Sequence, residues 1–165
     1  MLFRSWAGIA VAGNEPGRGC YKWELQGSEP PSSGTRMEKG WDGGSCHALA
    51  FKGSYVFAAT HQKGVLWLDS SKGDAAGWHA PVLGSGLPMR DVERIFHPVH
   101  TVAADPAQRL MLAGGPVGIY SSSDNGTNYE LSSGREFRDR VTLPNTWLFC
   151  SGEHAIEVVT EDAAG

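Results

Sequence analysis

The segment Ser122-Ser-Asp124-Asn-Gly126-Thr-Asn-Tyr129 follows the pattern Ser/Thr-x-Asp-x-Gly-x-x-aromatic. Each fixed position has a physical use in a tight connection between two strands. The carboxylate of Asp124 can accept backbone N–H groups within such a turn, and Gly126 can adopt a positive φ without steric cost. We expect the hydroxyl of Ser122 to tie the turn together and the ring of Tyr129 to fold back over the apolar side of the hairpin. The segment therefore predicts a strand connection and needs no substrate to explain it.

Hairpin patterns of a related kind recur along the chain. Each has an apolar strand that ends in small residues, a short polar or glycine-rich turn and a second apolar strand. They cover residues 9–23, 55–69, 110–124 and 147–161. Repeats of about 40–50 residues that are built from short strands are typical of β-propeller blades. Ordinary hairpins of a β-sandwich or barrel are the alternative interpretation.

The segment that contains Asp124 resembles the Asp-box, or BNR, repeat of sialidases, sortilin-like receptors and bacterial propeller proteins. The resemblance covers residues 84–132 best, because the upstream segments follow the order that such blades use. It implies a blade entry at residues 86–88, a first strand at 92–96, an Asp-Pro turn at 102–106 and further strands at 110–114 and 118–121. The copy that includes Asp69 matches loosely, with Trp78 as its aromatic residue, and the first and fourth copies lack the box.

The sequence therefore predicts an all-β fold, a β-propeller-like array of about four antiparallel blades. We expect a single domain over residues 1–165, with one long loop between the first two blades, at residues 26–45. The blades are expected at about residues 1–25, 46–83, 84–132 and 137–165. Three arrangements remain open: a half ring closed by a second copy, a small four-bladed ring, and part of a longer propeller.

Charge and composition narrow the classes of partner. The 14 basic and 18 acidic residues give a net charge of −4, and nucleic acid is not expected because phosphate binding needs a basic face. No stretch approaches the roughly 20 apolar residues of a membrane span. Residues 1–13 are interpreted as a strand rather than a signal peptide. The three cysteines are expected as reduced thiols, which slightly favours the cytoplasm, and one disulfide with one free thiol is the alternative.

The binding prediction concerns the turns between the second and third strands of the blades, which lie on one face in a propeller. A polar recognition rim is expected there, and ordinary solvated turn residues are the alternative. The predicted rim residues are Arg18, His61, Lys63, Glu153 and His154. Trp41, in the long loop, is a further candidate because an exposed tryptophan anchors partners; the alternative is a ring packed onto the blade below.

No catalytic residue, cofactor or metal is predicted. A sialidase-like site needs an arginine cluster for a substrate carboxylate, a Tyr–Glu nucleophile pair and an acid/base aspartate. The nearest string to the Arg-Ile-Pro signature of sialidases, at Arg94, lacks the proline. The pair Cys46-His47 and the histidines of His97-Pro-Val-His100 are ligand types for metals, but no second cluster completes a tetrahedral set by spacing. Nucleophile-elbow, Walker and dinucleotide patterns do not occur.

The expected role is a non-enzymatic interaction scaffold, or a subunit of a larger assembly, that presents loops to a protein or glycan partner. Self-association is one form of that partnership. The alternative is a carbohydrate-active, sialidase-like hydrolase or a glycan-binding module. A fluorogenic sialoside and a glycan array distinguish these roles.

Overall fold

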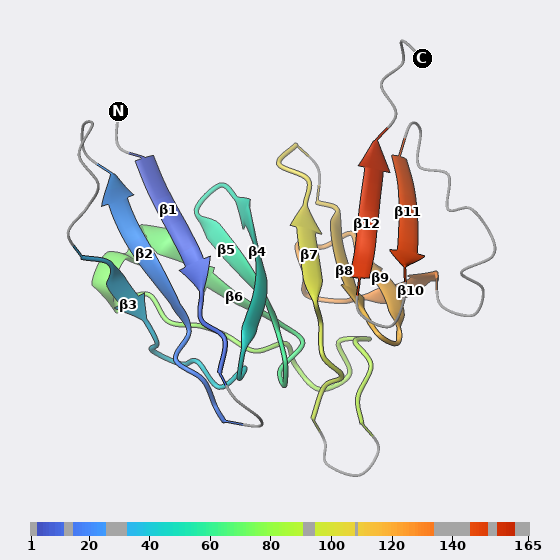
Figure 1. Ribbon diagram of the computed structural model, residues 1–165, viewed down its shortest axis with the longest axis horizontal. Coiled ribbons are helices and arrows are strands. Elements are labelled where there is room, and N and C mark those ends of the chain that lie inside the picture. Colours follow the sequence, from blue (N-terminus) through green and yellow to red (C-terminus); the bar gives the residue numbers. More distant parts are fainter. Residues whose placement is uncertain are drawn as a thin grey trace.

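The computed structural model describes residues 3–11, 15–25, 33–90, 95–107, 109–133, 146–151 and 155–160. The described chain is all-β apart from a short 3₁₀ helix, η1 (Ser70–Ala75), and every pair of neighbouring strands is antiparallel (Figure 1). The expectation of an all-β fold is therefore confirmed.

Consecutive strands pair with one another in each sheet. The first sheet contains β1 (Phe3–Gly8), β2 (Cys20–Leu25) and β3 (Thr35–Met37), and the second contains β4 (Cys46–Lys52), β5 (Tyr55–Thr60) and β6 (Val65–Asp69). The third contains β7 (Thr101–Ala104), β8 (Met111–Gly115), β9 (Gly118–Ser122) and β10 (Glu130–Ser133). A separate hairpin pairs β11 (Thr146–Ser151) with β12 (Ala155–Thr160). Both of its strands lie where the fourth hairpin pattern predicts them.

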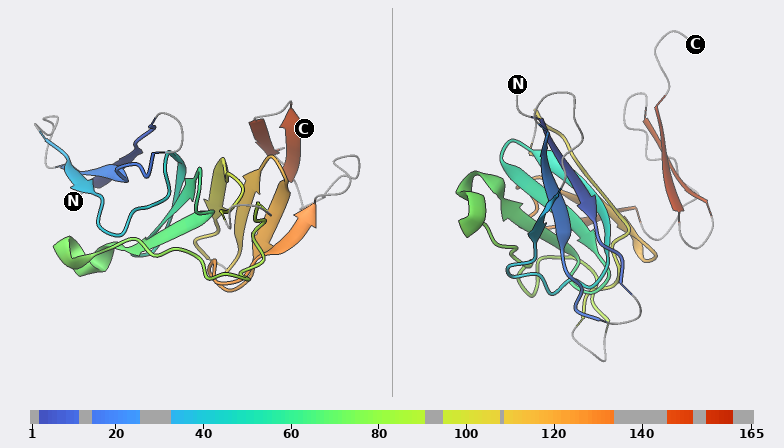
Figure 2. Two further views of the ribbon diagram at one scale, coloured as in Figure 1. Left: turned by 90° about the horizontal axis from the view of Figure 1, so that it is seen from below. Right: turned by 60° about the vertical axis from the view of Figure 1, so that its left-hand side comes forward.

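The first three sheets follow one another in a row, with the second between the other two (Figure 2). In this arrangement β1 contacts β4, and β4 contacts β7. The central strand β5 is consequently buried on both faces from Val56 to Thr60. A short, continuous apolar run is what a strand covered on both sides requires, and the sequence of β5 supplies one.

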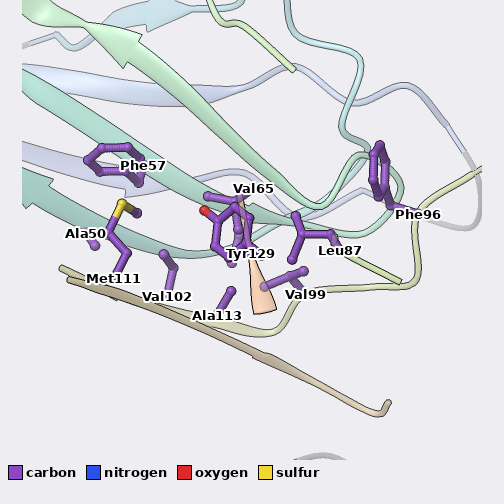
Figure 3. Packing of buried hydrophobic residues seen from close by; sticks show 11 residues of the cluster. Ala50, Phe57, Val65, Leu87, Phe96, Val99, Val102, Met111, Ala113 and Tyr129 are labelled. Atoms are coloured by element: carbon purple, nitrogen blue, oxygen red, sulfur yellow. The ribbon is translucent and has the colours of Figure 1, made fainter. Parts of the chain in front are cut away.

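Alternate residues of the second sheet belong to two separate cores, because successive side chains of a strand point to opposite faces. Val56 and Ala58 pack in a cluster with Cys20 of the first sheet. Phe57 and Ala59 pack in the other cluster, which includes the third-sheet residues Val102, Met111 and Ala113 and also Tyr129, the residue before β10 (Figure 3). The second sheet therefore holds its neighbours on both sides.

Two short strands lie outside the segments in which strands were expected. β3 lies within residues 26–45, which were predicted to be a loop, and pairs Met37 with Cys20. The first strand of the third sheet is β7, in the segment that was assigned to an Asp-Pro turn, while Phe96 makes only an isolated bridge to Met89. Residues 91–94 of the expected strand lie outside the described residues. Burial sets β7, since Val102 packs in the core between the second and third sheets. β3 is mostly exposed and is held by its pairing with β2.

The first strand of the chain is also displaced from its expected position. β1 ends at Gly8, and residues 9–11 do not continue it; residue 12 lies outside the described residues. The N–H of Ile9 donates to the carbonyl of Gly19 at 3.2 Å, while its carbonyl accepts the N–H of Cys46 at 3.0 Å. The backbone therefore turns from its own sheet toward the second sheet at this point, and the strand stops.

Two glycines occupy equivalent positions at the entries to the second and third sheets. Gly40 and Gly86 have φ values of 75° and 90°. A Cβ atom on Gly40 would lie 2.6 Å from the carbonyl oxygen of Trp78, and one on Gly86 would overlap the carbonyl oxygen of Tyr129. The residue before each glycine accepts the backbone N–H of the same aromatic residue, at 2.9 Å and 2.6 Å respectively. Each entry segment is thus fixed against the aromatic residue that follows the outer turn of its sheet.

Candidate functional site

The turn after β9 has the hydrogen bonds that its sequence predicts. The hydroxyl of Ser122 donates to Oδ1 of Asp124 at 2.8 Å and accepts the backbone N–H of Gly126 at 2.8 Å. Oδ1 of Asp124 also accepts the backbone N–H groups of Thr127 and Asn128, at 3.0 and 2.8 Å. Donation from the Asn128 backbone, followed by the Asn128 and Ser122 side chains, lowers the pKa of Asp124 to about 2.

The aromatic position of the turn has its expected structural role as well. The side chain of Tyr129 is buried in the core between the second and third sheets, and burial raises the pKa of its hydroxyl, with the charge of Asp124 as the second cause. Gly126 has a φ of 82°. The four fixed residues of the pattern therefore build a strand connection, as predicted.

Gly126→Ala is expected to lower the free energy of unfolding by about 2 kcal/mol, measured by urea denaturation. The positive φ strains any side chain, and the new Cβ would lie 2.9 Å from the Tyr129 hydroxyl oxygen and 3.1 Å from Sδ of Met111. The control is Gly84→Ala, at a φ of 89° with nothing within 4 Å of the Cβ position, which carries the strain alone, about 1 kcal/mol. Equal losses would show that the contacts beneath Gly126 are not formed.

Three strand connections lie together at one end of the sheets, which we name the turn end. They are the β1–β2 connection, the β5–β6 turn and the β8–β9 turn. Backbone hydrogen bonds of 2.8–3.2 Å run from sheet to sheet through the entry segments. The donor and acceptor pairs are Gly44 N–Pro16 O, Gln62 N–Gly43 O, Phe96 N–Gln62 O, Val99 N–Thr60 O and His100 N–Gly114 O. This network fixes the connections relative to one another.

The structure places three of the predicted rim residues at the turn end. Arg18 is exposed in the β1–β2 connection, and His61 and Lys63 are half-buried in the β5–β6 turn. Nζ of Lys63 lies 2.9 Å from Oδ2 of Asp42, a pair with both side chains more than a third exposed. Exposed pairs of this kind contribute little to stability. The other two rim candidates, Glu153 and His154, lie outside the described residues.

The expectation that Trp41 is an exposed anchor is wrong. Its side chain is only 8% exposed, and its indole Nε1 donates to the carbonyl of Gly44 at 2.9 Å. The ring packs edge-to-face against Trp78, with the ring centroids 5.0 Å apart. The entry segment folds onto the second sheet, and the indole of Trp41 is buried there. Trp41 therefore stabilises the turn end through its packing.

A histidine cluster at the turn end was not predicted as a unit. The ring of His47, at the start of β4, lies 5.8 Å from that of His61 and 5.0 Å from that of His100, measured between centroids. Burial lowers the pKa of His47, and the neighbouring His100 and His61 lower it further. Among the residues that the structure describes, no group of three or more His, Cys, Asp or Glu side chains is arranged to hold a metal ion.

The histidine cluster predicts a loss of stability in mild acid. The folded state disfavours the protonated form of His47, whereas an unfolded imidazole has a pKa of about 6.5. Below that pH the unfolded state binds more protons, so the free energy of unfolding falls as the pH drops. We expect the thermal midpoint to fall between pH 7 and pH 5.5, and to fall less in His47→Gln. His79→Gln, at the opposite end of the second sheet, is the control; an unchanged pH dependence in His47→Gln would contradict the prediction.

Comparisons with known proteins identify no relative: no family model, no curated protein and no solved structure matches the chain. In the described part of the chain, no helix has the length and apolar character that crossing a membrane requires. The role of the chain is therefore inferred from its own contacts and charges.

Proposed function

We propose that the chain is a β-propeller-like, non-enzymatic interaction scaffold that presents its turn end to a protein partner. The observation that carries this proposal is the burial of β5 on both faces between two further sheets. Consecutive blades of a propeller cover one another in this way, and each sheet here is a meander of consecutive strands. The Asp-box resemblance of residues 84–132 supports the same architecture.

The second and third sheets also share details that favour successive blades. Gly40 and Gly86 make matched contacts with Trp78 and Tyr129. β10 is the fourth strand of the third sheet, and in the second sheet His79 exchanges backbone hydrogen bonds of 3.0 and 2.8 Å with Trp67 on the outer strand β6. A single bridge thus takes the place of a fourth strand, in line with the four-stranded blades of propellers.

The turn end is suited to recognition because it is held in place and carries an exposed arginine. Its connections are fixed by hydrogen bonds between sheets, so little conformational freedom is lost when a partner binds. Arg18 is exposed, and the guanidinium of an arginine pairs with carboxylates through two parallel hydrogen bonds. We therefore expect the partner to present an acidic surface, and a second copy of this chain, with its net charge of −4, is one such partner.

The first experiment measures the mass in solution by light scattering after size exclusion. A dimer near twice 17.7 kDa that dissociates in Arg18→Glu would support self-association through the turn end. Lys72→Glu is the matched control, because Lys72 is exposed on η1 at the opposite end of the sheet. A dimer that is equally stable in both variants would contradict this use of the turn end.

If the protein is a monomer, the same two variants are compared for binding to acidic proteins by surface plasmon resonance. Binding that Arg18→Glu weakens and Lys72→Glu does not would support the proposal. Turnover of a fluorogenic sialoside that is lost on substitution of an arginine would overturn the non-enzymatic role in favour of a sialidase-like hydrolase.

A further inference from the structure

A cavity of about 500 Å³ opens at the end of the second and third sheets that lies away from the turn end. One side consists of β5 and β6 residues and of the segment 79–82. The other side is the turn after β9, at residues 124–127. Tyr55 begins β5, whereas Thr60, at its far end, belongs to the turn end. The volume of the cavity falls within the range of small-molecule sites, about 300–1,000 Å³. The proposed recognition role does not involve this cavity.

Aromatic rings form one wall of the cavity. The ring centroids of Tyr55 and Trp67 are 5.9 Å apart, and those of Tyr55 and Phe57 are 6.3 Å apart. His79 stacks on one face of Trp67, with the ring centroids 4.3 Å apart, and so fixes the indole and covers that face. Tyr55 is 44% exposed although it is a large aromatic residue on a packed sheet. The rings therefore offer π-surface to a bound molecule.

The opposite wall carries a negative charge. Asp124 lines the cavity, and its carboxylate accepts hydrogen bonds from Ser122, Thr127 and Asn128 in its own turn. These bonds hold it in the ionised form and occupy much of its hydrogen-bonding capacity, so it offers charge more than acceptor sites. The described residues that line the cavity include no lysine or arginine. The Nζ of Lys52, the register partner of Tyr55, is buried and is not among the groups of this lining.

We propose that this cavity binds a small organic cation of the quaternary ammonium class, between the rings of Tyr55 and Trp67 and the carboxylate of Asp124. A cation is attracted to the faces of tyrosine and tryptophan rings. A quaternary ammonium has no N–H group to donate. It therefore loses no hydrogen bond because the carboxylate of Asp124 already accepts hydrogen bonds from its own turn. A sugar, by contrast, leaves hydroxyls unsatisfied unless the wall supplies free donors and acceptors.

The test compares choline with 3,3-dimethylbutan-1-ol, a neutral molecule of the same shape, by isothermal titration calorimetry on the full chain. We expect choline to bind at least about tenfold more tightly, because only the charged molecule gains the attraction to rings and carboxylate. This comparison needs no variant and holds whether or not a substitution folds. Equal binding of both molecules, or no binding of choline at millimolar concentrations, would overturn the proposal.

Variants then locate the site. Tyr55→Leu should weaken choline binding about tenfold, while Tyr55→Phe, which keeps the ring, should bind nearly as well as the wild type. Phe51→Leu is the matched control, since Phe51 is 49% exposed on the neighbouring strand and does not line the cavity. The thermal midpoint of each variant establishes that it is folded. Choline binding that Tyr55→Leu leaves unchanged would place the ligand elsewhere and overturn the proposal.

Two further titrations identify the source of the ligand. Phosphatidylcholine vesicles that bind the wild type but not Tyr55→Leu would support the same chemistry with a lipid headgroup as its source. Choline binding without vesicle binding would support a free small molecule. Binding of maltose, with loss of that binding in Tyr55→Phe and no response to choline, would assign the cavity to a sugar and overturn the proposal.

Discussion

Gly86→Ala is expected to lower the free energy of unfolding by about 3–4 kcal/mol. Gly86 has a φ of 90°, and a Cβ atom there would overlap the carbonyl oxygen of Tyr129. Backbone atoms cannot move aside as a flexible side chain can. The entry segment must therefore shift, and the hydrogen bond of 2.6 Å from the Tyr129 N–H to the carbonyl of Ser85 is lost with it.

The control for this result lies two residues away. Gly84 has a φ of 89°, but nothing lies within 4 Å of its Cβ position. Gly84→Ala therefore carries the conformational strain without the overlap and should cost about 1 kcal/mol. Urea denaturation of the two variants measures the difference. Similar losses would mean that the entry segment does not pack against Tyr129, and would weaken the case that the second and third sheets are equivalent blades.

Leu66→Ala is expected to lower the free energy of unfolding by about 3 kcal/mol in the same measurement. Leu66, the second residue of β6, is fully buried in the core between the first and second sheets. Truncation of a buried leucine removes its contacts and leaves a cavity that a rigid surrounding fills only in part. The second sheet is itself packed on its other face. The residues around Leu66 therefore cannot move far enough to fill the cavity.

Leu83→Ala is the matched control, because Leu83 is 69% exposed. The change should fall within about 0.5 kcal/mol of the wild type. If Leu66→Ala also cost less than about 1 kcal/mol, the face of the second sheet that carries Leu66 would not be covered, and the row of three stacked sheets would be wrong.

The features that sequence reasoning predicted correctly are local ones. The Asp124 turn depends on residues within a few positions of one another, and its hydrogen bonds follow from the residue types alone. The hairpins β5–β6, β8–β9 and β11–β12 follow from alternation and turn residues in the same way. The apolar run of β5 is also typical of a strand that is covered on both faces.

The features that were missed depend on contacts between distant segments. The strand β3 is only three residues long, and nothing in its own composition distinguishes it from a loop. The burial of Trp41 is set by the second sheet, against which its segment folds. Three histidine rings meet at the turn end, those of His47, His61 and His100. Their proximity depends on how the sheets are aligned, which the sequence does not show.

The backbone hydrogen bonds that join the second and third sheets lie at the turn end, through Thr60 and Gln62, whereas the aromatic cavity lies at the far end of the same two sheets. The core between the two sheets includes Phe57, which also lines the cavity, so packed side chains connect the cavity to the bonded end. Occupancy at one end is therefore expected to alter hydrogen exchange of the Phe96 and Val99 amides at the other.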